Sequence, residues 1–153
     1  MEQEIIPMSR HLKIGTVSWG ALAGGKLSRT RENPTAGKRQ LVLTDAEFKI
    51  QDEVVAIAKE IGRTPSQVAV NWILQKSTSP LLGCRTLEQL EDNLGALEFE
   101  LTPQQIARLD EVSKDSPAKL FPHNFLGTDT KSTTFLHLPN PVDKKYDFDS
   151  RLY

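Results

Sequence analysis

Residues 80–93, PLLGCRTLEQLEDN, carry the most informative pattern of the chain. A short apolar run ends at Gly83, which predicts a buried strand and then a turn that contains Arg85. Thr86 is a favourable first residue for a helix. Its hydroxyl can accept a hydrogen bond from the backbone N–H of Gln89, while the Gln89 amide reaches back to the Thr86 N–H. The pattern therefore predicts a strand, a turn and a helix in immediate succession.

The junction between this strand and this helix has the composition of a phosphate-binding site. The first turn of a helix has unpaired N–H groups and a partial positive charge. Arg85 adds a planar guanidinium that is permanently charged, and Gly83 lets a ligand approach the backbone. The alternative is an ordinary capped helix with a solvated arginine beside it. Spacing alone does not choose between these interpretations.

The rest of the chain shows the same kind of helix start three more times, as Thr-x-x-Glu/Gln at residues 44–47, 64–67 and 102–105. Apolar side chains at helical spacing follow each start. Residues 2–13 predict a further short helix, residues 14–19 and 80–82 predict strands, and residues 28–43 predict a surface loop. Because helices follow the strands, the strands should be parallel and the fold class α/β.

Composition excludes several classes of protein. The 153 residues carry 19 basic and 20 acidic side chains, so no strong field favours nucleic acid or an anionic membrane. The single cysteine, Cys84, excludes an internal disulfide framework and suits a reducing compartment; we expect its thiol to be small and buried. No stretch approaches the roughly 20 apolar residues of a membrane span, no signal pattern begins the chain, and no metal-ligand spacing is present. We expect a cytoplasmic protein.

Two stretches resemble a known family. Residues 80–113 resemble the C-terminal signature of the aldo-keto reductases, and residues 5–26 resemble the strand and pyrophosphate-side loop that precede it in the barrel. FPHNFLG at residues 121–127 is similar to the aryl-alcohol dehydrogenase-like branch. The resemblance implies the C-terminal portion of a (β/α)₈ TIM barrel, with about two parallel strands and flanking helices. Since a complete barrel needs about 250 residues, this barrel would be incomplete. It also implies a partial oxidoreductase domain at 1–127 and a polar tail at 128–153.

The resemblance further implies that NADPH binds at two segments. Gly83 and Arg85 would face the adenosine 2′-phosphate, while the adenine and its ribose would contact Gln89, Asp92 and Asn93. Asp92 stands where the family often has glutamate, which shortens the reach. The pyrophosphate and nicotinamide side would be lined by Trp19, Gly20, Ala21, Leu22, Ala23 and Gly24. Many relatives place Ser-Pro at positions 20 and 21, so one hydroxyl contact would be lost here.

The family's catalytic residues have no counterparts. It protonates the forming alkoxide with a tyrosine tuned by lysine, with aspartate and histidine nearby, and all four belong to the first half of the barrel. The only tyrosines, Tyr146 and Tyr153, lie in the polar tail. The resemblance therefore implies an NADPH-dependent reductase of aldehydes and ketones that is inactive alone. A small carbonyl substrate would bind only if the missing half were supplied, and the exposed barrel edge could associate with another chain.

Two other interpretations stay open. Residues 64–76 could be the recognition helix of a helix-turn-helix, with Gln67 and Asn71 reading bases. The charge balance opposes this, because phosphate contacts dominate affinity for DNA and that helix carries only Lys76. The chain could also be a non-catalytic, nucleotide-binding or regulatory remnant.

Overall fold

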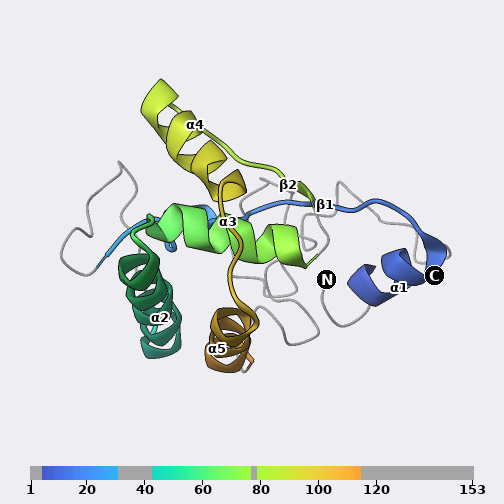
Figure 1. Ribbon diagram of the computed structural model, residues 1–153, viewed down its shortest axis with the longest axis horizontal. Helices are drawn as coiled ribbons and strands as arrows, with labels where there is room; N and C mark the ends of the chain where they lie inside the picture. The colour runs from blue at the N-terminus through green and yellow to red at the C-terminus, as the bar shows by residue number, and fades with distance from the viewer. Residues whose placement is uncertain (1–4, 31–42, 77–78, 115–153) are drawn as a thin grey trace, which may run out of the picture. The chain divides into compact units, whose positions relative to one another are not determined.

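A computed structural model describes residues 5–30, 43–76 and 79–114. These residues lie in a compact unit that spans Met1–Lys114. The element order is α1 (Ile5–Leu12), β1 (Val17–Ser18), η1 (Ala23–Gly25), α2 (Asp45–Ile61), α3 (Pro65–Gln75), β2 (Ser79–Pro80), α4 (Leu87–Leu94), η2 (Gly95–Leu97) and α5 (Pro103–Ser113) (Figure 1). In the described ranges, no helix has the length and apolarity that crossing a bilayer requires.

The predicted helix starts are confirmed. Thr44, Thr64 and Thr102 each precede a helix, and their hydroxyls accept from the backbone N–H three residues later. In all three the third helical residue bonds back to the threonine N–H, which completes a capping box. α2 ends at Gly62, whose φ of 65° lies in the left-handed region that glycine adopts without strain. The ends of these helices therefore follow from local sequence.

The two strands are parallel, as predicted, but shorter and more exposed than expected. Val17 pairs with Ser79 and Ser18 with Pro80. Val17 is 60% exposed and Leu81, directly after β2, is 58% exposed. The prediction of a buried strand is therefore wrong. Parallel strands are normally buried by further strands and by helices on both faces, and in the described residues this sheet contains β1 and β2 alone.

The core lies between helices rather than on the sheet. It consists of Val54, Ile57, Ala58, Val68, Leu101 and Leu109. α3 is the central element, because it packs against α2, α4, η2 and β2. Figure 1 shows α3 between α4 on one side and the neighbouring helices α2 and α5 on the other. Burying each large aliphatic side chain stabilises the fold by about 1.5–3 kcal/mol, so these helices hold one another without a barrel.

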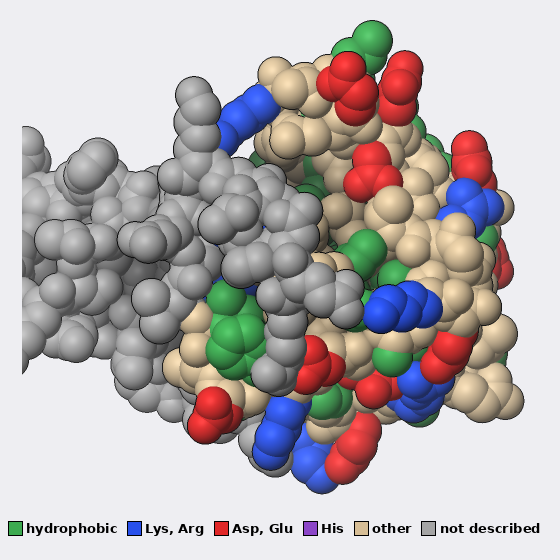
Figure 2. Space-filling view, turned by 90° about the vertical axis from the view of Figure 1, so that its left-hand side faces the viewer, with side chains coloured by type: hydrophobic (Ala, Val, Ile, Leu, Met, Phe, Trp, Pro, Cys, Tyr) green, Lys and Arg blue, Asp and Glu red, His purple; other side chains and the backbone are tan. Residues whose placement is uncertain are grey.

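α4 and the following η2 turn their leucines away from this core. The exposed fractions of Leu87, Leu90, Leu94 and Leu97 are 65%, 43%, 53% and 68%. The sequence predicts these four residues as one apolar face, and the helical spacing is confirmed. Elsewhere, Figure 2 shows acidic, basic and apolar side chains interspersed over the visible face. Large apolar side chains are also exposed near the strands and on α1, among them Met8, Val17 and Trp19.

The two polar residues of α3 proposed to read bases are engaged within the fold. Asn71 is only 3% exposed, and its side chain donates to the carbonyls of Ala96 (2.9 Å) and Phe99 (2.7 Å) and accepts from the Leu101 N–H (3.0 Å). Gln67 is engaged in contacts with α4, described below. Base readout requires polar atoms that can reach a groove. The structure therefore argues against base readout by Gln67 and Asn71.

Candidate nucleotide-binding site

The two segments of the predicted site leave the sheet at the same edge. β1 and β2 are parallel, and Ser18 is opposite Pro80. The segment 19–24 follows β1 directly, and Gly83 and Arg85 follow β2 by a few residues. Carboxyl ends of parallel strands meet at one edge, which is where barrel enzymes bind their ligands. The structure thus brings both predicted segments to the edge that the fold uses for binding.

The segment after β1 forms a tight turn. Gly20 and Gly24 have φ values of 77° and 67°, and Ala23 has a φ of 49°. The Ala23 N–H donates to the Gly20 carbonyl at 2.8 Å, and the Gly25 N–H donates to the Leu22 carbonyl at 2.9 Å. Left-handed backbone suits glycine and is uncommon for alanine. The predicted small-residue loop is therefore a 3₁₀ turn. In it Ala21 is buried, while Trp19 before it is 54% exposed.

Lys26 and Gln51 hold this turn against α2. The Lys26 ammonium pairs with Glu47, and the Gln51 Nε2 donates to the Lys26 carbonyl at 2.8 Å. Burial acts to raise the pKa of Glu47, but its bonds with Lys26 and Thr44 outweigh this and leave the pKa below its ordinary value. Lys26 is thus engaged in structure rather than available to a phosphate.

The turn between β2 and α4 differs in one respect from the prediction. The Gln89 N–H donates to the Thr86 hydroxyl at 3.3 Å, as expected. The Gln89 Oε1, however, accepts from the Arg85 N–H at 2.9 Å instead of from Thr86. The predicted capping box is therefore wrong at this helix. With an extended Thr86, φ −131° and ψ 161°, the amide reaches one residue further back along the chain.

Fewer backbone amides are open here than the sequence predicts. The Arg85 and Gln89 N–H groups both donate to side-chain oxygens. The pKa of Glu88 lies below its ordinary value, first because of its interaction with the Thr86 hydroxyl and then because of its own backbone N–H. The Arg85 side chain is exposed, and its guanidinium takes part in none of the ion pairs formed by the described residues. An anion at this turn would therefore be bound mainly by the Arg85 guanidinium rather than by unpaired backbone amides.

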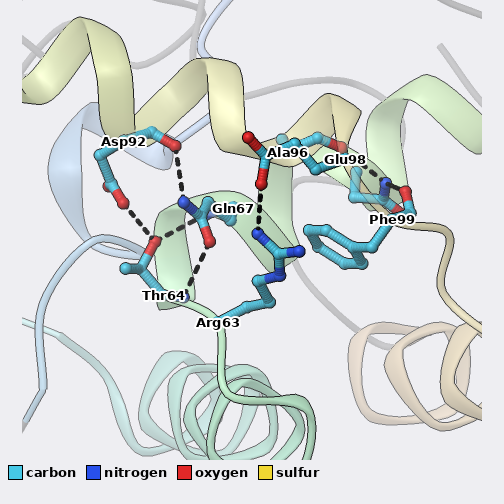
Figure 3. Close-up of polar contacts among 8 residues, drawn as sticks. Arg63, Thr64, Gln67, Asp92, Ala96, Glu98 and Phe99 are labelled. Carbon is cyan, nitrogen blue, oxygen red and sulfur yellow. Dashed lines mark hydrogen bonds and ion pairs between the residues drawn. The ribbon is translucent and has the colours of Figure 1, made fainter.

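Asp92 and Asn93 point inward rather than to solvent. The Thr64 hydroxyl donates to the Asp92 Oδ1 at 2.8 Å, and the Gln67 Nε2 donates to the Asp92 carbonyl at 3.0 Å (Figure 3). Asn93 is 5% exposed, and its Nδ2 donates to the Cys84 Sγ at 3.2 Å. The sequence contains the Thr64 cap but no local signal for its partner on α4. Gln89, in contrast, is exposed.

Cys84 is exposed, so the prediction of a buried thiol is wrong. It follows a strand that no further strand of the described chain covers. In the portion of the chain that the structure describes, no group of three or more His, Cys, Asp or Glu side chains could hold a metal ion.

Comparison with known proteins decides the family. The family model "Aldo/keto reductase family" matches residues 1–114. The chain belongs to this family. A probable aryl-alcohol dehydrogenase of Saccharomyces cerevisiae, AAD4, is 31% identical over 97% of this chain and 48% of its own length. The putative aryl-alcohol dehydrogenase YFL057C of the same yeast is 30% identical over 93% of this chain and 100% of its own length.

A solved structure supports the fold. The glycerol dehydrogenase AKR11B4 from Gluconobacter oxydans superposes with a TM-score of 0.62 and 22% identity, over 79% of this chain and 41% of that one. The chain spans about half the length of AAD4 and of the putative aryl-alcohol dehydrogenase AAD10 of the same yeast, at 48% and 51%. The aldo-keto reductases are oxidoreductases that use a nicotinamide cofactor. The predicted family, branch and partial TIM-barrel fold are confirmed.

Proposed function

We propose that this chain provides the NADP(H)-binding surface of an aldo-keto reductase, with the adenosine 2′-phosphate held by Arg85. The observation that carries the proposal is the exposed Arg85 guanidinium, outside every ion pair of the described residues, at the carboxyl edge of a parallel strand pair. Arginine binds phosphate with two parallel, charge-assisted hydrogen bonds. The extra phosphate of NADP(H) would supply the acceptor oxygens.

The residues around Arg85 fit a nucleotide in part. A Cβ at Gly83 would meet nothing within 4 Å, so space beside this backbone is open. Gln89 is exposed on the same turn of α4 and would contact the adenine or its ribose. The backbone amides fit less well, because side chains already bond to two of them. Recognition would therefore rest on side chains, chiefly on Arg85.

The turn after β1 would line the pyrophosphate and nicotinamide side. Its left-handed glycines at positions 20 and 24 keep side chains out of the way of the backbone. The half-exposed Trp19 ring offers an apolar surface for the nicotinamide. The other residues proposed for this side are Ala21, Leu22 and Ala23.

The complete reaction would need residues that this chain lacks. The cofactor supplies the hydride for carbonyl reduction, and the forming alkoxide needs a proton donor. No described side chain at the edge is a tyrosine, and Tyr146 and Tyr153 lie outside the described residues. We propose that the chain binds NADP(H) in the cytoplasm without turnover. Reduction of aldehydes and ketones would then require the other half of the barrel.

The proposed domain, 1–127 with a tail at 128–153, extends past the compact unit and the family match. Both of these end at residue 114. Residues 115–153 lie outside the described residues.

Arg85→Ala tests the nucleotide site. We expect the Kd for NADPH to rise about 10- to 100-fold, because a hydrogen bond to a charged group contributes roughly 1.5–3 kcal/mol. The Kd for NADH should change much less, since NADH lacks the 2′-phosphate. Fluorescence titration of the 153-residue chain measures both constants. Lys59→Ala, which removes one exposed positive charge from α2, is the matched control. Equal losses for both nucleotides would contradict the assignment.

A further inference from the structure

The capping box at the start of α3 also bonds to a second helix. Within the box, the Thr64 N–H donates to the Gln67 Oε1 and the Gln67 N–H donates to the Thr64 hydroxyl, each at 3.2 Å. The same two side chains also donate to Asp92 of α4 (Figure 3). The Thr64 hydroxyl donates to the Asp92 Oδ1 at 2.8 Å, and the Gln67 Nε2 donates to the Asp92 backbone carbonyl at 3.0 Å. One pair of side chains thus both starts α3 and holds α4.

The other capping boxes show that this second contact is not a requirement of capping. The Thr44 hydroxyl donates to Glu47 of its own box at 3.2 Å. The box of Thr102 and Gln105 closes with bonds of 2.9 Å and 3.3 Å. α2 and α5 begin equally well in these cases. The contact between Thr64 and Asp92 therefore reflects the packing of α3 against α4.

Gly95 lies very close to the Gln67 side chain that takes part in this contact. A Cβ at Gly95 would lie 2.3 Å from the Gln67 Nε2, the atom that donates to the Asp92 carbonyl. Its φ of −57° is ordinary for any residue, so backbone strain does not require glycine here. A larger residue at position 95 would instead displace the Gln67 amide, and with it the bond to the Asp92 carbonyl.

A short series of contacts connects Asp92 to the candidate site. Asp92 faces α3, and the next residue, Asn93, is buried and donates to the Sγ of Cys84. Cys84 is the residue before Arg85. The position of the turn between β2 and α4 thus depends on the place where α3 holds α4.

We propose that the contact of Thr64 and Gln67 with Asp92 fixes the 83–85 turn, and that Asp92 is a positioning residue for Arg85 rather than a ligand of the nucleotide. The consequence for binding rests on the proposed function; the fixing of the turn does not. The Asp92 oxygen nearest Thr64 is engaged at 2.8 Å, and α4 keeps the exposed Gln89 for contact with a ligand.

The test measures amide hydrogen exchange in the full 153-residue chain without nucleotide. Thr64→Val removes the hydroxyl, and Asp92→Ala removes its acceptor. Each should speed exchange over residues 83–93 about 3- to 10-fold, because one hydrogen bond contributes roughly 0.5–1.5 kcal/mol. Thr64→Ser and Asp92→Asn keep a donor and an acceptor, and should restore slow exchange. The double variant Thr64→Val/Asp92→Ala should be no faster than the worse single one, because both remove the same contact.

Thr102→Val is the matched control, because it removes a capping hydroxyl from α5 without touching α4. It should leave exchange at 83–93 unchanged. The proposal is overturned if Thr64→Val resembles Thr102→Val at 83–93, or if it speeds exchange equally in α2 and α5, since either result denies a specific hold on the turn.

Nucleotide titration separates this inference from the proposed function. If the wild-type chain binds NADPH, Thr64→Val should weaken binding about as much as Asp92→Ala, whereas a direct ligand role for Asp92 predicts loss in Asp92→Ala alone and would overturn the positioning role. If the wild-type chain binds no NADPH, the proposed function fails, and the exchange experiment still decides whether the contact fixes the turn.

Discussion

Glu47 joins three parts of the chain. Its Oε2 accepts from the Thr44 N–H at 2.8 Å and closes the capping box of α2. Its Oε1 pairs with Lys26 in the segment that follows the candidate pyrophosphate turn. Since the pKa of Glu47 in the folded chain lies below its ordinary value of 4.5, folding favours the ionised carboxylate. This stabilisation is complete above that value and is lost as the pH falls through the lower, folded pKa.

Glu47→Gln should therefore make helix content less sensitive to acid. Below about pH 4.5, the wild-type chain should lose more helical circular dichroism than the variant, because only the wild type takes up a proton at this position. Glu91→Gln removes an exposed carboxylate on α4 and serves as the control, with an acid response like that of the wild type. Identical acid profiles for Glu47→Gln and the wild type would contradict this role.

α4 and the following η2 together have two unlike faces. One side holds Asn93, Gly95 and Ala96 against α3, where they are buried. The other side exposes four leucines, at positions 87, 90, 94 and 97, each more than 40% exposed. In a TIM barrel every helix covers strands of the barrel, whereas here the described sheet ends at β2. Contiguous exposed apolar surface of this kind favours association.

We expect the purified chain to associate through this face. Leu87→Lys combined with Leu94→Lys should shift sedimentation toward the monomer, because charges on the face make its burial costly. The control is Gln104→Lys with Ala107→Lys, which adds the same charge to exposed positions of α5. Sedimentation velocity at several concentrations measures the effect. A wild-type chain that stays monomeric throughout would disprove the expectation.

The chain as a whole corresponds to a portion of the aldo-keto reductase barrel. Its family match, strand pair and helices correspond to a portion of a barrel, and it covers 41% of the glycerol dehydrogenase chain on which it superposes. The described edge offers residues for binding, while none of its side chains is a tyrosine that could protonate an alkoxide. The proposed function therefore assigns binding, and not the proton transfer, to this chain.

We expect no turnover of aromatic aldehydes by the 153-residue chain. In the presence of an aromatic aldehyde, the rate at which NADPH absorbance falls should be the same with and without the protein. Turnover that Tyr146→Phe abolishes would show that the tail supplies the acid and would contradict the proposed division. Turnover that survives this change would point instead to contamination or to another donor, and mass spectrometry of the sample would identify a contaminating reductase.

Local sequence was sufficient for the helix starts and for the family. A capping box involves residues three positions apart, so Thr44, Thr64 and Thr102 could be recognised without any tertiary information. The same reasoning failed at Thr86, where the Gln89 amide chooses between two N–H groups only one residue apart. Strand lengths were also overestimated, because a strand extends only as far as its neighbours pair with it.

The amino-acid order alone thus determined the helix starts, the parallel α/β class and the aldo-keto reductase family, because each depends on contacts within a few residues or on a shared motif. The binding edge near Arg85 stays a prediction. Only the folded arrangement decided that Asp92 bonds to Thr64, 28 positions away, that Lys26 pairs with Glu47, and that the leucines of α4 stay exposed. These outcomes depend on which distant surfaces meet, and hydrophobic packing selects those surfaces without leaving a local pattern in the sequence.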